Sequence, residues 1–299
     1  MYEKFLISLR DNQKRRKHSI AQMDSVFGQH GYQIFDAIDT RKFITYDKAT
    51  DVWSMNKDHE TAVRTEFMFR TRITDIVVEE SLRKEDSWIL MNPGGVGCTL
   101  SHLGVMKMFL KSRHSLAFIA EDDIEFLPET SEGAFDEIAE QLVTTEPMMA
   151  LSFSYTNTGA QLYLQKDSVV PLSNDRALYR PFEEQVVYST MGYFLNRAMA
   201  ENLLANAFPV SFSPDWFHKF IAQGWLKHLW CVYPFLSQPS GFNSTIMLQD
   251  HRDPGGHNSL TGIAFHRAAE FCLKRQVPVI GNLVRKRREE KYAYNIVIV

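Results

Sequence analysis

Leu116-Ala117-Phe118-Ile119-Ala120-Glu121-Asp122-Asp123 is the stretch that decides the fold, because an apolar run leads directly into three carboxylates. Such a run predicts a strand buried on both faces, as in parallel sheets. Open α/β sheets bind ligands at the carboxyl ends of their strands, where these acids lie. Three adjacent carboxylates repel one another and favour a hard divalent cation such as Mg²⁺ or Mn²⁺. A solvated acidic turn is the alternative for Glu-Asp-Asp alone.

A β-α-β pattern opens the chain and predicts a parallel sheet. Residues 5–9 predict a strand, and the following helix runs through Met23 with Ile20 and Met23 facing inward. Residues 32–37 predict the second strand.

Later elements follow from apolar spacing and from turn residues. We expect helices over 99–112 and 197–206, and two more helices that begin at the caps Ser131 and Ser213. We expect strands over 148–153, 186–195 and 229–235. Residues 92–95 predict a turn, and 41–94 predict surface helices and loops, with helices at 60–70 and 74–82. There is no clear linker, which favours one continuous domain with a C-terminal extension.

Composition excludes several classes of protein. A net charge of −3 gives no whole-surface attraction for nucleic acid. No apolar run reaches the length of a membrane span, and the start lacks the layout of a signal peptide. Cys98, Cys231 and Cys272 are widely spaced without a Cys-x-x-Cys pair, which argues against a disulfide framework and a zinc site. We therefore expect a cytoplasmic protein.

Several motifs resemble glycosyltransferase family 25. They are, in order, Ile7-Ser8-Leu9, Arg15-Arg16, Phe35-Asp36-Ala37-Ile38-Asp39, Gly97-Cys98-Thr99-Leu100-Ser101-His102, Ile119-Ala120-Glu121-Asp122-Asp123, Met191-Gly192-Tyr193-Phe194 and Pro214-Asp215. The resemblance covers about residues 4–245. Lys14 and Thr40 depart from the Glu and Gly that are common in the family.

The resemblance implies an α/β fold of GT-A type, with a Rossmann-like mostly parallel central sheet flanked by helices and a C-terminal helical extension. Residues 1–250 would be the catalytic domain, with a donor half at about 1–150 and an acceptor half at about 151–250. Residues 251–299 would be a flexible loop and a basic extension.

The resemblance also implies inverting transfer of a hexose, galactose first, from a UDP-sugar to a lipooligosaccharide or lipopolysaccharide acceptor. A glucosyltransferase of the same family and a non-catalytic domain that binds nucleotide sugars or glycans are alternatives. A nucleotidyltransferase or phosphatase is a third, although the chain has no Walker-type phosphate loop.

The acidic triplet is the expected metal site, for Mn²⁺ or Mg²⁺. Strand alternation would place Glu121 and Asp123 on one side and Asp122 on the other. We expect Asp123 to be the first metal ligand and Asp122 the second, and Glu121 to face the ribose or the metal's water shell. Asp215, just inside a predicted helix start, is the candidate catalytic base.

The remaining candidates would bind the donor nucleotide sugar. With Glu121 and Asp122, they are Ser8, Arg10, Arg16, Asp36, Ala37, Ser101 and His102. Asp36 and Asp39 would face the base or ribose, or are turn acids. A cap and a structural histidine are the alternatives for Ser101 and His102. For Arg15 we favour a solvated helix face, and for Cys98 a packed small residue.

The C-terminal segment supplies two further expectations. A Gly-rich loop between His251 and His257 could close over the donor, although incidental surface histidines are the favoured interpretation. The basic residues between Lys274 and Lys291 could contact anionic lipid at the inner face of the bacterial inner membrane, near a lipid-linked acceptor; a solvated helix is the alternative.

Overall fold

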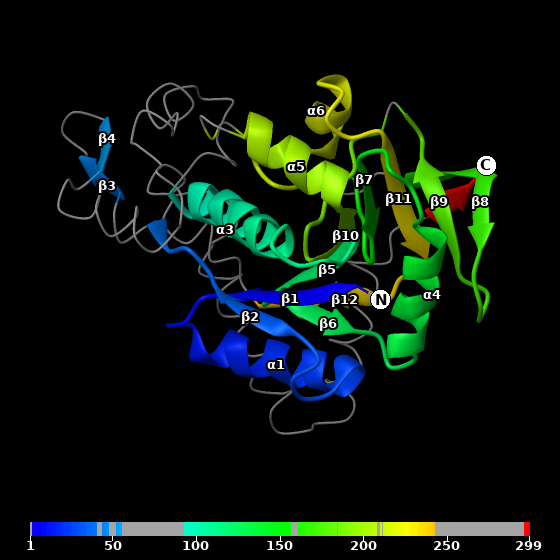
Figure 1. Ribbon diagram of the computed structural model, residues 1–299, viewed down its shortest axis with the longest axis horizontal. Coiled ribbons are helices and arrows are strands. Elements are labelled where there is room, and N and C mark those ends of the chain that lie inside the picture. Colours follow the sequence, from blue (N-terminus) through cyan, green and yellow to red (C-terminus); the bar gives the residue numbers. More distant parts are fainter. Residues whose placement is uncertain are drawn as a thin grey trace, which may run out of the picture.

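A central sheet with helices on both faces forms the framework of the protein (Figure 1). The computed structural model describes residues 2–40, 44–47, 52–55, 93–156, 161–183, 185–207, 210, 212–242 and 296–299. In this part of the chain the large sheet has nine strands, in the order β13-β8-β9-β11-β7-β10-β5-β1-β2. The prediction of an α/β fold built on a large central sheet is confirmed.

Helices and groups of strands alternate along most of the chain. They are β1 (Glu3–Ser8), α1 (Gln13–Phe27), β2 (Gln33–Asp36), β3 (Ile44–Asp47), β4 (Val52–Met55), α3 (Pro93–Phe109), β5 (Leu116–Glu121), β6 (Ile124–Phe126), α4 (Glu132–Gln141), β7 (Met148–Leu151), β8 (Leu162–Pro171), β9 (Ala177–Pro181), β10 (Gly192–Asn196), α5 (Arg197–Asn206), α6 (Phe217–Ala222), β11 (His228–Tyr233), β12 (Ser237–Pro239) and β13 (Ile296–Ile298).

The first part of the sheet is parallel, as the β-α-β pattern predicts. β1 pairs in parallel with β2 on one side and with β5 on the other, so that Phe5 lies opposite Gln33 and Ile119. After β1, the chain therefore forms β2 on one side of it first and β5 on the other side later. Such a reversal of strand order creates a crevice outside the carboxyl ends of the strands, where open α/β sheets bind ligands.

The rest of the sheet is mixed, which corrects the expectation of a mostly parallel sheet. β10 is antiparallel to both of its neighbours, β5 and β7, and β9 is antiparallel to β11 and β8. β7 and β11 are parallel to each other. An apolar run predicts a buried strand but carries no information on its direction.

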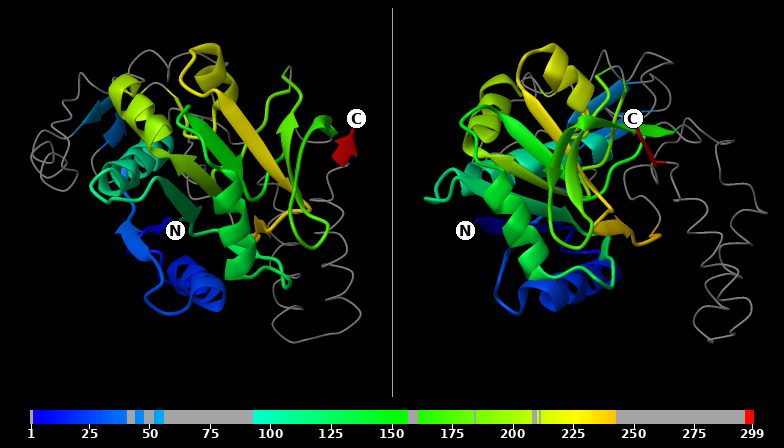
Figure 2. Two further views of the ribbon diagram at one scale, coloured as in Figure 1. Left: turned by 45° about the vertical axis from the view of Figure 1, so that its right-hand side comes forward. Right: turned by 90° about the vertical axis from the view of Figure 1, so that its right-hand side faces the viewer.

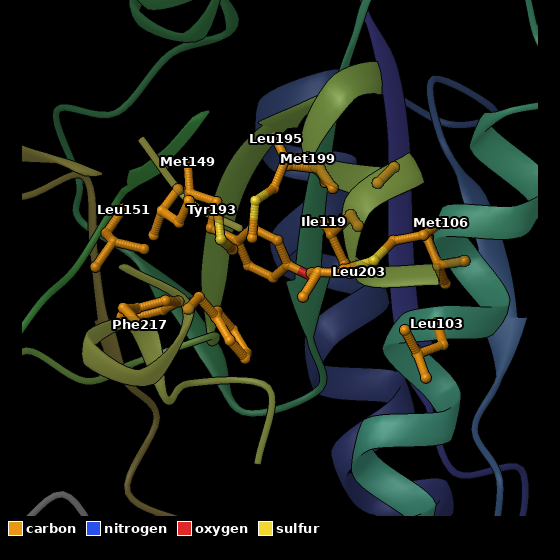
Figure 3. Close-up of a cluster of buried hydrophobic side chains, with 14 of the residues drawn as sticks. Leu103, Met106, Ile119, Met149, Leu151, Tyr193, Leu195, Met199, Leu203 and Phe217 are labelled. Atoms are coloured by element: carbon orange, nitrogen blue, oxygen red, sulfur yellow. The ribbon is translucent and has the colours of Figure 1, made fainter. Parts of the chain in front are cut away.

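Alternation along the strands divides the core into two layers. Phe5, Ile7 and Ile119 belong to the cluster that includes the buried faces of α3, α5 and α6. Leu6 and Phe118 belong to the opposite cluster, under α1 and α4. Figure 3 shows the first layer, in which side chains from α3, α5 and α6 meet those of β5, β7 and β10.

The starts of two helices differ from the prediction. α3 begins at Pro93, where a turn was expected, because proline suits the first helical position: its φ is helical and its missing N–H has no partner in the first turn. α6 begins only at Phe217, after a turn closed by the Trp216 N–H and the Ser213 carbonyl at 3.1 Å. Ser213 is therefore not its cap, and Pro214 is not its first residue.

Two further local predictions need correction. Ser131 occupies the N-cap position of α4, but its side chain makes no capping hydrogen bond. The strand expected over 186–195 is β10, which begins at Gly192.

An antiparallel hairpin of β3 and β4 lies in the region where surface helices and loops were expected. The helices predicted over 60–70 and 74–82 lie outside the described residues. At the other end, β13 pairs in parallel with β8 at the sheet edge, far from the N-terminal strand (Figure 2). The domain division at residue 250 stays a prediction.

No helix in the described ranges is both long enough and apolar enough to cross a bilayer.

Candidate active site

A cavity opens at the carboxyl ends of β1, β2 and β5, where the strand order reverses. Its walls come from these strand ends, from the first turn of α1 and from α3. The lining residues are Ile7, Leu9, Arg15, Ala37, Ile38, Asp39, Gly94, Cys98, Ser101, His102, Glu121, Asp122 and Asp123. The acidic stretch of the sequence forms part of its wall.

Arg15 lies buried against the two aspartates of the strand tip. Its Nη2 is 2.6 Å from Asp122 Oδ1 and 3.1 Å from Asp123 Oδ2, and only 6% of its surface is exposed. Asp122 also accepts hydrogen bonds from the Ser8 hydroxyl at 3.1 Å and the Leu9 N–H at 3.2 Å. Asp122 is thus held on several sides.

This arrangement corrects two expectations about side-chain direction. β5 ends at Glu121, and Asp122 and Asp123 form the turn to β6, so strand alternation does not apply to them. Both aspartates face the same guanidinium. Arg15 is not on a solvated helix face: Asn12 caps α1 by accepting from the Arg15 N–H, which puts this side chain in the first turn beside the end of β1.

Asp123 carries negative charge that its protein neighbours do not fully balance. Burial raises its pKa to about 7, and the charges of Glu121 and Asp122 act in the same direction, while Arg15 opposes them. Its Oδ1 is buried without a hydrogen-bond partner among the described residues. Ser240 donates its N–H to the Asp123 carbonyl at 2.8 Å, and its hydroxyl is likewise buried without a partner there. Unsatisfied hard oxygens beside an excess of negative charge fit a divalent cation.

Glu121 contacts α3 and the segment before β10. Its Oε1 is 3.2 Å from His102 Nε2 and accepts a hydrogen bond from the Thr190 hydroxyl at 2.5 Å. Burial alone would raise the pKa of Glu121, but the contacts with His102 and Thr190 and the charge of Arg15 lower it. On its other side, His102 Nδ1 is 2.7 Å from the Tyr193 hydroxyl.

Ser101 and His102 lie in the middle of α3, which excludes the capping alternative for Ser101. The Ser101 hydroxyl accepts from the Ile38 N–H at 2.8 Å and donates to the Gly97 carbonyl at 2.7 Å. It therefore ties α3 to the loop after β2. The Ala37 N–H bonds the Ser8 carbonyl at 2.9 Å and joins the ends of β1 and β2.

Arg10, Arg16 and Asp36 form a second charged group, which is not part of the cavity lining. Asp36 accepts from Arg10 Nη2 at 2.5 Å and from Arg16 Nη1 at 2.6 Å. Although burial opposes ionisation, these two guanidinium groups lower the pKa of Asp36. The group lies at the carboxyl end of β2, next to Ala37 of the lining.

Asp215 lies in the turn before α6 rather than inside the helix. Its Oδ1 accepts from the Ser213 hydroxyl at 2.6 Å. Burial raises its pKa, the Ser213 hydrogen bond opposes that effect, and the charge of Glu121 adds to it. The expectation that Asp215 lies just inside a helix start is therefore wrong. Asp215 is not part of the cavity lining. Its charge nevertheless raises the pKa of Cys98, and the charge of Glu121 raises the pKa of Asp215.

Sequence reasoning assigned two residues of the cavity wall, Arg15 and Cys98, to structural roles only. Arg15 follows the cap Asn12 by three residues, a spacing that could have placed it in a first helical turn at the end of β1. Cys98 lies four residues before His102, and this spacing puts both on one side of a helix. His251, His257 and the basic residues 274–291 lie outside the described residues.

A comparison with models of protein families matches residues 1–217, described as "Glycosyltransferase family 25 (LPS biosynthesis protein)". No curated protein matches the chain significantly. The matched region contains the whole cavity wall and Asp215. The strand-end cavity with its acidic wall is thus carried by the part of the sequence that the family model describes, and the chain belongs to glycosyltransferase family 25, the glycosyltransferases of lipopolysaccharide biosynthesis.

Proposed function

We propose that the protein is an inverting hexosyltransferase of GT-A type that moves galactose from UDP-galactose to a lipooligosaccharide or lipopolysaccharide acceptor. One observation carries the proposal: three carboxylates meet at a strand-end cavity, and Asp123 has an unsatisfied buried oxygen there. Glucose from UDP-glucose is the second candidate for the transferred sugar.

Asp123 is the residue best suited to hold Mn²⁺ or Mg²⁺, and Asp122 is a second ligand candidate. Asp122 is already bonded to Arg15, Ser8 and the Leu9 N–H, so it has less capacity for an ion. When bound, the ion supplies Lewis-acid stabilisation of the diphosphate leaving group, worth several kcal/mol.

In this proposal, residues of β1, α1 and β2 bind the nucleotide. Arg15 brings a buried positive charge to the cavity wall, where a diphosphate would gain from it. Arg10 and Arg16 hold Asp36 at the end of β2, and an ionised Asp36 can accept hydrogen bonds from ribose hydroxyls or a base. Ser8 and Ser101 bond protein groups, so they position the wall of the donor site.

Asp215 is the proposed base that takes the proton of the acceptor hydroxyl. A base works best when its pKa lies near the working pH, and burial shifts the pKa of Asp215 upward from its usual acidic range. The charge of Glu121, a residue of the cavity wall, raises the pKa of Asp215 further, which supports a position near the acceptor. The basic residues 274–291 would bring the enzyme to anionic lipid at the inner face of the inner membrane, where a lipid-linked acceptor is found.

A screen of nucleotide sugars tests this function. The purified protein is incubated with UDP-galactose, UDP-glucose and nucleotide sugars of other bases, with Mn²⁺ and then with excess chelator, and the released nucleotide is identified. We expect release of UDP from UDP-galactose that requires the ion. Release of pyrophosphate or phosphate would indicate a nucleotidyltransferase or phosphatase, and binding without release would indicate a binding domain.

Replacing Asp215 by Asn tests the base separately from the donor site. The amide keeps the size of the side chain but cannot accept the proton, so we expect transfer to fall by about 10²–10⁴-fold while UDP affinity stays unchanged. Glu201→Gln, on the exposed side of α5, is the control and should keep full activity. Unchanged transfer by Asp215→Asn would exclude the role.

A further inference from the structure

Cys98, His102 and Glu121 form a second cluster of possible metal ligands at the cavity wall, apart from the Asp122–Asp123 turn. One ligand atom from each, the sulfur, a ring nitrogen and a carboxylate oxygen, lie within 4.8 Å of one another. Cys98 and His102 come from successive turns of α3, and Glu121 is the last residue of β5. The helix and the strand end thus bring three different ligand types together.

We propose that these three side chains bind a thiophilic divalent cation of the zinc class. Thiolate, imidazole and carboxylate are all ligands that Zn²⁺ accepts, and three protein ligands leave a fourth position open to the cavity. Hard ions such as Mg²⁺ and Mn²⁺ prefer oxygen ligands, so the thiolate distinguishes this site from the one proposed at Asp123. The inference does not depend on glycosyl transfer.

The residues behind the cluster support metal binding. A histidine that binds a metal through one ring nitrogen usually donates its other N–H to a fixed partner. Here His102 Nε2 faces Glu121, and Nδ1 is 2.7 Å from the hydroxyl of Tyr193, which is itself fully buried. The hydroxyl of Thr190 orients Glu121 in the same way. Tyr193 is packed among the apolar side chains of α3, α5 and the neighbouring strands (Figure 3), so this partner cannot move away easily.

The thiol changes its protonation state when the ion binds. In the metal-free protein, burial raises the pKa of Cys98 well above its usual value, and Glu121, Asp215, Asp123 and Asp122 add to this effect. A bound dication reverses the local electrostatics and deprotonates a coordinating thiol. One proton therefore leaves Cys98 as the sulfur–metal bond forms, and no electrons are transferred.

Titration of the metal-free full chain with Cd²⁺ tests the proposal, because a cadmium–thiolate bond gives an ultraviolet charge-transfer band. We expect a band that saturates at one ion per chain, that is lost in Cys98→Ser, and that persists in Cys231→Ser and Cys272→Ser. Zn²⁺ should compete for the site, and excess Mn²⁺ should not. No band in the wild-type protein, a band that survives in Cys98→Ser, or displacement by Mn²⁺ would overturn the proposal.

Tyr193→Phe provides a variant that keeps the aromatic ring and removes only the hydroxyl. We expect it to retain the cadmium band and to bind the ion about 10–100-fold more weakly, as is typical when the outer partner of a metal-bound histidine is lost. This variant needs no change in the ligands themselves, so it remains informative if Cys98→Ser fails to fold. Unaltered affinity would mean that His102 is not a ligand.

Discussion

At the scale of single residues, the site depends on one buried arginine. Arg15 lies between Asp122 and Asp123 with 6% of its surface exposed, while Arg16, its neighbour in the sequence, turns to Asp36. The sequence predicts where the acids gather, because an apolar strand ends in them. It does not predict which arginine pairs with them, because Arg15 and Arg16 are adjacent in the sequence. Only the packing of α1 against β1 decides between the two.

Asp36 allows a test of charge pairing as a function of pH. Its pKa is lower in the folded protein than its ordinary value of 3.8, because Arg10 and Arg16 outweigh the effect of burial. A lowered pKa stabilises the fold above about pH 4, and this stabilisation is lost as the pH falls through the pKa of the folded protein. Asp36→Asn should therefore lower the free energy of unfolding at neutral pH, by at most about 1 kcal/mol, since the carboxylate is 40% exposed.

Urea unfolding of the wild-type protein and Asp36→Asn, at about pH 7 and about pH 3, measures this effect. The two proteins should differ at the higher pH and approach equal stability at the lower. A difference of the same size at both values would contradict the role of the two arginines.

At the scale of elements, α3 matters most, because it carries Cys98, Ser101 and His102 to the cavity. Gly97 lets this helix approach the loop after β2: a Cβ there would lie 2.4 Å from the Ile38 carbonyl oxygen and 2.9 Å from Thr40 Oγ1. Apolar spacing predicted that α3 exists, but it did not predict that α3 starts at Pro93. A Pro-Gly-Gly sequence is compatible with both a turn and a first helical turn, and only the tertiary contacts of α3 decide between them.

Gly97→Ala should push α3 away from residues 38–40 and lower the free energy of unfolding by about 1–3 kcal/mol, the usual cost of overpacking. Gly133→Ala is the matched control, since a Cβ at this position of α4 would meet only Ser131 Oγ at 3.8 Å. We expect the control to be neutral or slightly stabilising. Chemical unfolding of both variants provides the comparison, and equal stability of the two would show that α3 does not need the close approach.

At the scale of the whole molecule, the sheet is where sequence and structure differ most. The parallel part, β2-β1-β5, was predicted because its strands alternate with helices. The antiparallel direction of β10 and the pairing of β13 with β8 were not predicted, because strand direction and long-range pairing leave no periodic signal in the sequence. The acidic stretch nevertheless lies in the parallel part, so the place of the site could be predicted without the rest of the sheet.

β13 pairs residues 296–298 with β8 at the edge of the sheet, and removal of β13 tests this pairing. The Val299 N–H bonds the Leu164 carbonyl at 3.0 Å, and Val299 accepts from the Lys166 N–H at 2.7 Å. Deleting residues 296–299 should cost about 1–3 kcal/mol of stability, at about 0.5–1.5 kcal/mol for each hydrogen bond. Thermal unfolding measures the loss. Ile298→Thr keeps the backbone pairing and should change little, and an unaffected truncation would contradict the pairing.

Whether Asp123 holds a divalent cation beside the nucleotide is tested most directly by calorimetric titration with UDP, in Mn²⁺ and in excess chelator. Wild-type protein should bind UDP at least about 10²-fold more tightly with Mn²⁺, as several kcal/mol of stabilisation requires. Asp123→Asn should lose this dependence, while Glu125→Gln, two residues away on β6, should keep it. Equal UDP affinity of the wild-type protein in Mn²⁺ and in chelator, or an Asp123→Asn variant that retains the Mn²⁺ effect, would contradict the account.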